Sequence, residues 1–126
     1  GLGFERPTPI QAQVWPAALA GLDLIGIAPT GSGKTLAYLA PAVPHILDRQ
    51  VALGTAKSIA GPVCLVLVPT RELAKQVSES CGGTSNSGWI KRLFGLRACA
   101  VYGGAGKEVQ LDTIVTLGMP HILAAT

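Results

Sequence analysis

The most specific chemistry of the chain lies in one glycine-rich segment, Ala28-Pro29-Thr30-Gly31-Ser32-Gly33-Lys34-Thr35. Its spacing follows the phosphate-binding P-loop pattern, although Ala28 stands where the general pattern has glycine. Gly31 and Gly33 allow the backbone to turn tightly, so that successive N–H groups can surround an anion. We expect Lys34 to reach the β- and γ-phosphates and the Thr35 hydroxyl to bind Mg²⁺. The segment therefore predicts a site for a nucleoside triphosphate.

A second informative stretch, residues 3–11 (GFERPTPIQ), ends in a side-chain amide. The amide of Gln11 offers one acceptor and two donors, which match the donor and acceptor on the edge of adenine. Guanine presents the opposite pattern there, so such a site would reject it. Phe4 provides a flat surface that suits a base. Taken alone, these residues also fit a simpler interpretation, in which Gln11 is solvated in a first helical turn and Phe4 packs on Val14.

A third stretch, Pro69-Thr70-Arg71, directly follows the most apolar run of the chain, residues 63–68. In open α/β sheets, ligands gather beyond the carboxyl ends of the strands. Thr70 and Arg71 suit a phosphodiester backbone that is held without reading its bases. Gly103-Gly104 and Thr126 follow the next two apolar runs, so we expect them at the same edge as Arg71 and the P-loop. The alternative is that Arg71 is an ordinary surface charge.

Alternating strands and helices must position these segments. We expect strands at residues 23–28, 63–68, 97–102 and 121–125, and helices at residues 8–20, 34–47, 71–80 and 107–117. Thr8 is the expected cap and Pro9 the first residue of the first helix, which Pro16 should kink or split. Residues 48–62 and 81–88 are expected to be connections. The uninterrupted run 63–68 is typical of a strand buried on both faces, as in a parallel sheet covered by helices.

Composition bounds the remaining possibilities. The 126 residues, 48% of them apolar, suit one folded domain, and the net charge of +3 suits a polyanionic partner without requiring one. The three cysteines and two histidines show no metal-ligand spacing, which argues against a zinc site and favours reduced thiols inside a cell. No apolar run is long enough for a membrane helix, and no leader opens the chain. Nucleus, nucleolus and cytoplasm remain equally open.

Together these segments resemble the DEAD-box family of ATP-dependent RNA helicases. Residues 3–11 resemble its Q motif, residues 28–35 its motif I, residues 69–74 (PTRELA) its motif Ia, and Gly103-Gly104 its GG element. Thr126 resembles the start of its motif Ib. The order is the same throughout, and four ordered motifs are far more specific than a single P-loop.

The resemblance implies a RecA-like P-loop NTPase fold, an α/β domain with a parallel sheet flanked by helices. Residues 1–126 would form the first part of its ATP-binding domain and end before the Walker B strand. It implies ATP and Mg²⁺ as cofactors and the RNA backbone as partner. The residues around adenine would be Phe4, Arg6, Thr8 and Gln11. Residues 28–35 would hold phosphate and magnesium, with Lys34 and Thr35 as the catalytic pair. The RNA contacts would be Pro69, Thr70, Arg71, Gly103, Gly104 and Thr126.

The 126 residues contain no D-E-A-D segment and no second RecA-like domain. We therefore expect the longer protein to hydrolyse ATP and remodel RNA duplexes, and this chain alone to be inactive. We also expect the chain alone to be poorly soluble, because strand edges would remain unpaired. Two other interpretations stay open: a catalytically inactive nucleotide- or RNA-binding remnant, and a P-loop ATPase directed to DNA.

Overall fold

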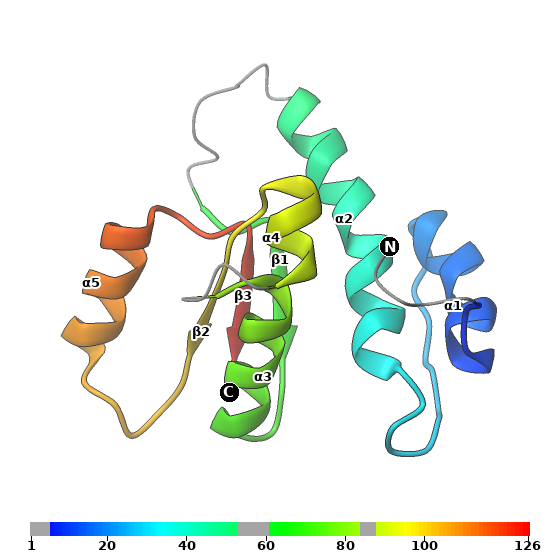
Figure 1. The fold of residues 1–126 in the computed structure, drawn as a ribbon, viewed down its shortest axis with the longest axis horizontal. Coiled ribbons are helices and arrows are strands. Elements are labelled where there is room, and N and C mark those ends of the chain that lie inside the picture. Colours follow the sequence, from blue (N-terminus) through cyan, green and yellow to red (C-terminus); the bar gives the residue numbers. More distant parts are fainter. Residues whose placement is uncertain (1–5, 53–60, 84–87) are drawn as a thin grey trace. The chain divides into compact units, whose positions relative to one another are not determined.

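A computed structural model describes residues 6–52, 61–83 and 88–126. The chain divides into two compact units, residues 1–48 and 49–126, which are described separately below. Figure 1 labels the five helices and three strands assigned within the described residues. Phe4 lies outside the described residues.

The first unit contains α1 (Pro9–Leu19) and most of α2 (Lys34–Ala52). Thr8 has an extended backbone at the cap position and Pro9 is the first helical residue, as predicted. The predicted split of the helix at Pro16 is wrong, because α1 continues through it, whereas a kink there stays a prediction. A proline removes one N–H, but the Ala20 N–H still reaches the Pro16 carbonyl at 3.2 Å and closes the last turn.

Helix α2 is longer than predicted and includes residues 48–52, which the sequence placed in a connection. Its buried residues Leu39, Val43 and Ile46 follow one another at helical spacing. This apolar stripe stabilises the helix although Pro41 and Pro44 lie inside it. In the same helix, Nε2 of His45 lies 2.9 Å from the carbonyl oxygen of Ala18 and links α2 to the end of α1.

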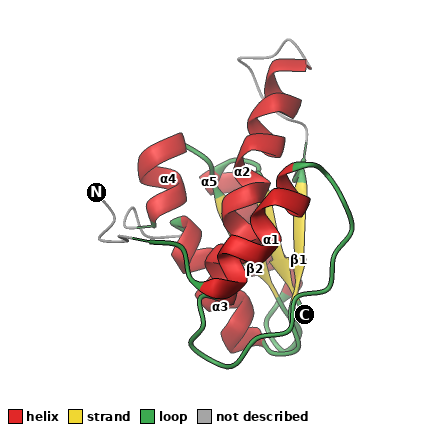
Figure 2. Ribbon diagram, turned by 90° about the vertical axis from the view of Figure 1, so that its right-hand side faces the viewer, coloured by secondary structure: helices red, strands yellow, loops and turns green. Residues whose placement is uncertain are grey.

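The predicted strand at residues 23–28 is wrong. The whole connection between α1 and α2 is loop, drawn in green in Figure 2. A strand needs N–H and C=O partners on a neighbouring strand, and no assigned strand of the described residues pairs with this segment. Ile25 and Ile27 are consequently 94% and 92% exposed.

The second unit is a parallel α/β arrangement. Its elements in chain order are β1 (Cys64–Leu67), α3 (Arg71–Cys81), α4 (Trp89–Phe94), β2 (Ala98–Val101), α5 (Lys107–Leu117) and β3 (Ile122–Ala125). The three strands lie in the order β1-β3-β2 and all pair in parallel. The predicted parallel sheet with helices is therefore confirmed. The short helix α4 was not predicted.

Helix α3 lies against β2 and β3 (Figure 1). Its buried residues Ala74, Val77 and Cys81 recur every three or four positions, which gives the helix one apolar face. The prediction that residues 63–68 are buried on both faces is wrong, because Leu65 and Leu67 of β1 are 59% and 73% exposed. Strand β1 is an edge strand of this sheet, and α3 packs on the other two strands.

Candidate functional site

The P-loop has the tight backbone that its glycines predict. Gly31 and Gly33 both have positive φ angles, 77° and 87°, and the Ser32 N–H donates to the Pro29 carbonyl at 3.3 Å. Residues with a side chain rarely adopt such angles. A Cβ on Gly33 would also lie only 2.5 Å from Nε2 of Gln11. Glycine is therefore required at position 33 both by the backbone and by its neighbour.

The Lys34 side chain hydrogen-bonds to the backbone at the start of the P-loop. Its Nζ donates to the carbonyl oxygens of Ala28, at 2.6 Å, and Pro29, at 2.9 Å. Lys34 is also the first residue of α2, where unpaired N–H groups and the helix dipole favour an anion. A phosphate oxygen carries a formal charge and forms stronger hydrogen bonds with an ammonium than a carbonyl does. The Lys34 ammonium can therefore exchange its two carbonyl acceptors for the oxygens of a bound phosphate.

Two hydroxyl groups, one in the P-loop and one beside it, are buried and lack a hydrogen bond within the described structure. They are Oγ of Ser32 and Oγ1 of Thr8. A buried polar group without a partner costs about 1–3 kcal/mol, so such groups are normally satisfied by protein, water or ligand. Thr8 Oγ1 lies 3.3 Å from the position of a Cβ on Gly33 and so belongs to the surroundings of the P-loop. These hydroxyls fit a polar nucleotide ligand.

Gln11 joins helix α1 to the P-loop. Its Oε1 accepts the Thr8 N–H at 3.0 Å, and its Nε2 donates to the Gly33 carbonyl at 3.2 Å. The side chain is 4% exposed, so the interpretation of Gln11 as a solvated first-turn residue is wrong. One lone pair and one N–H of the amide remain, which is what an adenine edge would use.

Of the other two predicted adenine contacts, Phe4 lies outside the described residues. Arg6 is exposed and forms no polar contact among the described residues. Thr8 and Gln11 are therefore the two predicted base-site residues that the structure brings against the P-loop.

The predicted RNA contacts in the second unit meet at the carboxyl ends of its strands. Leu67, Ala125 and Val101 lie side by side in the register of the sheet. The ladder continues for one step, since the Val68 N–H donates to Ala125 at 2.9 Å and the Thr126 N–H donates to Val101 at 3.3 Å. The segments that follow are Pro69-Thr70-Arg71, Gly103-Gly104 and Thr126. Their predicted proximity to one another is confirmed, whereas a common edge with the P-loop stays a prediction.

The Arg71 guanidinium lies near Gly104 at this end of the sheet. Nη1 of Arg71 lies 3.5 Å from the position that a Cβ on Gly104 would take, and Gly104 has a φ of +81°. An open hollow of about 420 Å³ adjoins Gly104, and Gly103, Lys107 and Thr126 are also among the residues that line it. A lysine and two glycines around one hollow, with the Arg71 guanidinium near Gly104, suit the close approach of an anionic backbone.

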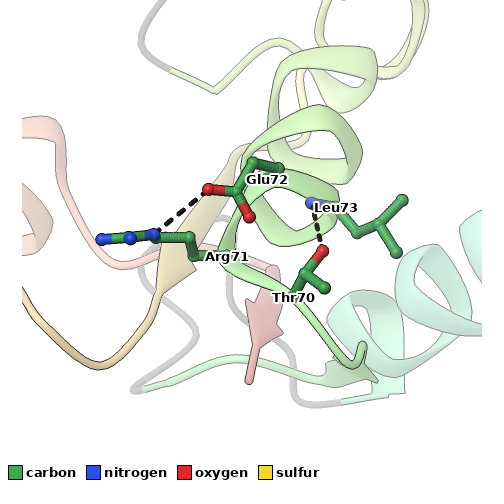
Figure 3. A network of polar contacts seen from close by, with 4 residues as sticks. All are labelled: Thr70, Arg71, Glu72 and Leu73. Atoms are coloured by element: carbon green, nitrogen blue, oxygen red, sulfur yellow. Dashed lines mark hydrogen bonds and ion pairs between the residues drawn. The ribbon is translucent and has the colours of Figure 1, made fainter.

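Local contacts at the start of α3 hold Arg71 in place (Figure 3). Oγ1 of Thr70 caps the helix by accepting the Leu73 N–H at 3.3 Å, and Arg71 Nε pairs with a carboxylate oxygen of Glu72 at 3.1 Å. The Arg71 and Glu72 side chains are 55% and 75% exposed. An exposed pair of this kind contributes only about 0–1 kcal/mol, so the guanidinium remains available for a phosphate.

Sequence reasoning missed two residues at this end of the sheet. The Gln110 amide bonds to the backbone of Tyr102 and Ala105, on both sides of Gly103-Gly104. Nζ of Lys75 lies 4.9 Å from the centre of the Tyr102 ring, a cation–π contact. The only sequence signal for Lys75 was its place one helical turn after Arg71, and for Gln110 its place in the helix after the glycine pair.

The cysteines offer no second chemical site. Burial raises the pKa of the Cys81 thiol to about 12, and burial also raises the pKa of Cys64 and Cys99. Thiols with such values remain protonated near neutral pH and are poor nucleophiles. Across residues 6–52, 61–83 and 88–126, no group of three acidic, histidine or cysteine side chains could hold a metal ion. No helix in those ranges is long and apolar enough to span a membrane.

The chain is similar to known helicases over almost all of its length. The family model described as DEAD/DEAH box helicase matches residues 8–126. The chain is 53% identical over 114 residues to DEAD-box ATP-dependent RNA helicase 30 of Arabidopsis thaliana, which covers 87% of this chain and 17% of that protein. It is 45% identical over 109 residues to the probable ATP-dependent RNA helicase DDX46 of Homo sapiens, covering 86% of this chain and 10% of that protein. The chain thus spans less than a quarter of either relative.

Solved structures show the same fold. A hypothetical ATP-dependent RNA helicase from Sulfolobus tokodaii matches with a TM-score of 0.73 and 29% identity, over 99% of this chain and 30% of that one. The DEAD-box helicase Mss116, bound to ssRNA and UDP-BeF, matches with a TM-score of 0.76 and 24% identity, over 99% of this chain and 24% of that one. The fold of the chain is therefore RecA-like.

Proposed function

This chain belongs to the DEAD/DEAH box helicase family, and on that basis we propose that it supplies the nucleotide site and part of the RNA-binding surface of an ATP-dependent RNA helicase. The observation that carries the proposal is the conformation of the P-loop. Its two left-handed glycines and the Lys34 ammonium at the head of α2 form a cradle for phosphate. The names of the curated relatives supply the rest of the proposal, ATP as nucleotide and RNA as partner.

In the proposed function, the P-loop binds the triphosphate of ATP. Lys34 leaves the carbonyls of Ala28 and Pro29 and pairs with the β- and γ-phosphates, where it neutralises charge. The Thr35 hydroxyl is the proposed ligand of Mg²⁺, which would stabilise the charge that develops during phosphoryl transfer. The remaining lone pair and N–H of Gln11 read the adenine edge, with Phe4, Arg6 and Thr8 around the base.

The carboxyl ends of β1, β2 and β3 are the proposed RNA surface. Arg71 and Thr70 contact phosphates, and Pro69, Gly103, Gly104 and Thr126 let the backbone approach closely. Such contacts carry no base information, so binding would be independent of sequence. The acidic residues that position the attacking water are not among the 126 residues. We therefore propose that hydrolysis belongs to the longer protein and that this chain alone binds without turnover.

The test is ATP hydrolysis by the full-length protein, with and without single-stranded RNA. RNA should stimulate hydrolysis, and Lys34→Ala should reduce it by about a hundredfold or more, because phosphoryl transfer depends on charge neutralisation. Lys91→Ala, which changes a lysine of α4, is the matched control and should behave as the wild type.

Three results would reject parts of the proposal. Absence of nucleotide binding in the full-length protein would identify an inactive remnant. Equal stimulation by single-stranded DNA and RNA would point to a DNA-directed ATPase. Equal hydrolysis of GTP and ATP would reject the role of Gln11 at the adenine edge.

A further inference from the structure

The side chain of Gln110 hydrogen-bonds to the backbone on both sides of the Gly103-Gly104 turn. The amide of Gln110, in the first turn of α5, forms three hydrogen bonds, and all of them go to the backbone of residues 102–105. Among the described residues, no other side chain of α5 hydrogen-bonds outside its own helix. The contact therefore links α5 specifically to the turn that carries the two glycines.

Two of these bonds complete the edge of the sheet. Strand β2 is an edge strand, and Val101 directs its carbonyl to Thr126 on the β3 side. Because backbone groups alternate along a strand, the next residue, Tyr102, directs its N–H and C=O to the open side. Oε1 of Gln110 accepts the Tyr102 N–H at 2.9 Å and Nε2 donates to the Tyr102 carbonyl at 3.0 Å. The amide thus takes the place of a residue on a neighbouring strand.

The third bond closes the other side of the turn. Nε2 of Gln110 also donates to the carbonyl of Ala105 at 3.3 Å. Gly103 and Gly104 lie between the two anchored residues, are exposed, and have no side chain to restrict them. Glycine has more backbone freedom than any other residue, so an unanchored turn of this kind would sample many conformations.

Tyr102 is restrained on its ring as well as on its backbone. Lys75 of α3 places its ammonium 4.9 Å from the ring centre. The residue before the glycine pair is therefore fixed by α3 on one side and by α5 on the other. Among the described residues, the N–H groups of Gly103 and Gly104 have no acceptor, so they are available to a ligand while their neighbours are held.

We propose that Gln110 is a positioning residue for RNA, which orders the Gly103-Gly104 turn before the nucleic acid arrives. The inference rests on the RNA-binding role proposed above. A turn that is ordered in advance loses less conformational freedom on binding. Removing the amide should therefore weaken RNA binding and leave nucleotide binding unchanged, because nucleotide is proposed to bind the P-loop.

The test compares two glutamine variants of the full-length protein. Gln110→Met keeps the length of the side chain and removes all three hydrogen bonds, and Gln76→Met changes an exposed glutamine of α3 as the matched control. Affinity for a fluorescein-labelled single-stranded RNA is measured by anisotropy, affinity for a fluorescent ATP analogue by titration, and order of the turn by amide hydrogen exchange of Tyr102–Ala105. We expect Gln110→Met to exchange faster and to bind RNA about tenfold more weakly, with unchanged nucleotide affinity. Gln76→Met should match the wild type.

Gln110→Glu adds a reversible form of the same perturbation. Its carboxylate can accept from Tyr102 but cannot donate, and it faces the carbonyls of Tyr102 and Ala105. When protonated, the carboxyl regains one donor. Relative to wild type at each pH, exchange and RNA binding should both recover as the pH falls towards about 5. Because exchange is measured without RNA, it separates ordering of the turn from simple repulsion between the carboxylate and phosphates.

The outcomes distinguish this inference from the function on which it rests. Faster exchange with RNA affinity within about twofold of wild type would overturn the positioning role. Unchanged exchange in Gln110→Met would overturn it as well. If the wild type itself binds no RNA, the proposed function fails and the positioning role fails with it, whereas the exchange data still report whether Gln110 orders the turn.

Discussion

The close approach of Gln11 to Gly33 makes one substitution especially informative. Replacing Gly33 by alanine places a Cβ only 2.5 Å from Nε2 of Gln11, on a backbone with a φ of +87°. Gly31→Ala provides a matched control, because Gly31 has a similar φ of +77° and nothing within 4 Å of its Cβ position. Both variants strain the backbone, but only Gly33→Ala displaces the amide.

The expected loss of stability has two components, backbone strain and displacement of the Gln11 amide. An L-residue in the left-handed region costs about 1–2 kcal/mol, which is the whole expected effect of Gly31→Ala. Gly33→Ala adds the displacement of Gln11, which is 4% exposed and loses its bond to the Gly33 carbonyl. A buried polar group left without its partner costs about 1–3 kcal/mol. The total for Gly33→Ala is therefore about 2–5 kcal/mol.

The assay is native-state hydrogen exchange on peptides that cover residues 28–37 of the full-length protein, without nucleotide. It reports the free energy of local opening of this segment. Nucleotide affinity is a weaker readout, because strain that is present in both the free and the bound loop cancels. Five proteins are compared: the wild type, Gly31→Ala, Gly33→Ala, Gln11→Ala and the double variant of Gly33→Ala with Gln11→Ala.

The double-mutant comparison isolates the contact. In the Gln11→Ala background the clash is absent, so Gly33→Ala should cost only the backbone component, about 1–2 kcal/mol. The coupling energy between the two positions should then be about 1–3 kcal/mol. If Gly33→Ala costs no more than Gly31→Ala, or costs the same with and without Gln11, the proposed tie between α1 and the P-loop is wrong.

Two further predictions concern the second unit. Arg71→Ala should weaken RNA binding equally for all sequences and reduce the slope of log affinity against log salt by about 1. The control Arg92→Ala, in α4, should change neither the affinity nor the slope. A loss of affinity that depends on the RNA sequence would contradict a backbone contact. Burial and the positive charge of Arg97 lower the pKa of His121 from 6.5, so the folded unit binds fewer protons than the unfolded chain below that value. Its stability should be complete above about pH 6.5 and fall as the pH drops, by at most about 1.4 kcal/mol per pH unit. Hydrogen exchange of β2 and β3 at several pH values measures this fall, and a curve as steep in His121→Asn would contradict it.

The sequence predicted elements well where local signals and long-range pairing agree. Helix α5 has its predicted bounds, and β2 and β3 lie within the predicted runs 97–102 and 121–125. The failures depend on partners that are distant in the sequence. Residues 23–28 have the apolar character of a strand, but strand formation requires a neighbour, and local character does not supply one. Burial of Leu65 and Leu67 likewise depends on what covers the second face of β1.

The residues of the candidate site were likewise predictable where local signals suffice and not where distant partners decide. The P-loop glycines were predictable, because each needs a backbone angle that only glycine adopts easily. The role of Gln11 was only half predictable: its amide suggested adenine, while its bond to Gly33 joins residues that are 22 positions apart. Gln110 gave no signal beyond its place in the helix after the glycine pair, because a glutamine in the first turn of a helix is common and its partners are backbone atoms.

At both candidate sites, a glutamine side chain thus restrains the backbone of a glycine-rich loop. Gln11 stands in the first turn of α1 and holds the Gly33 carbonyl, and Gln110 stands in the first turn of α5 and holds the turn around Gly103-Gly104. A loop rich in glycine cannot be fixed by its own side chains, so a neighbouring element must restrain its backbone. Glutamine is suited to this task because its amide both donates and accepts, as a peptide group does, and does so at every pH. A glutamate at either position would lose the donor and direct a charge at carbonyl oxygens, close to where phosphates are proposed to bind.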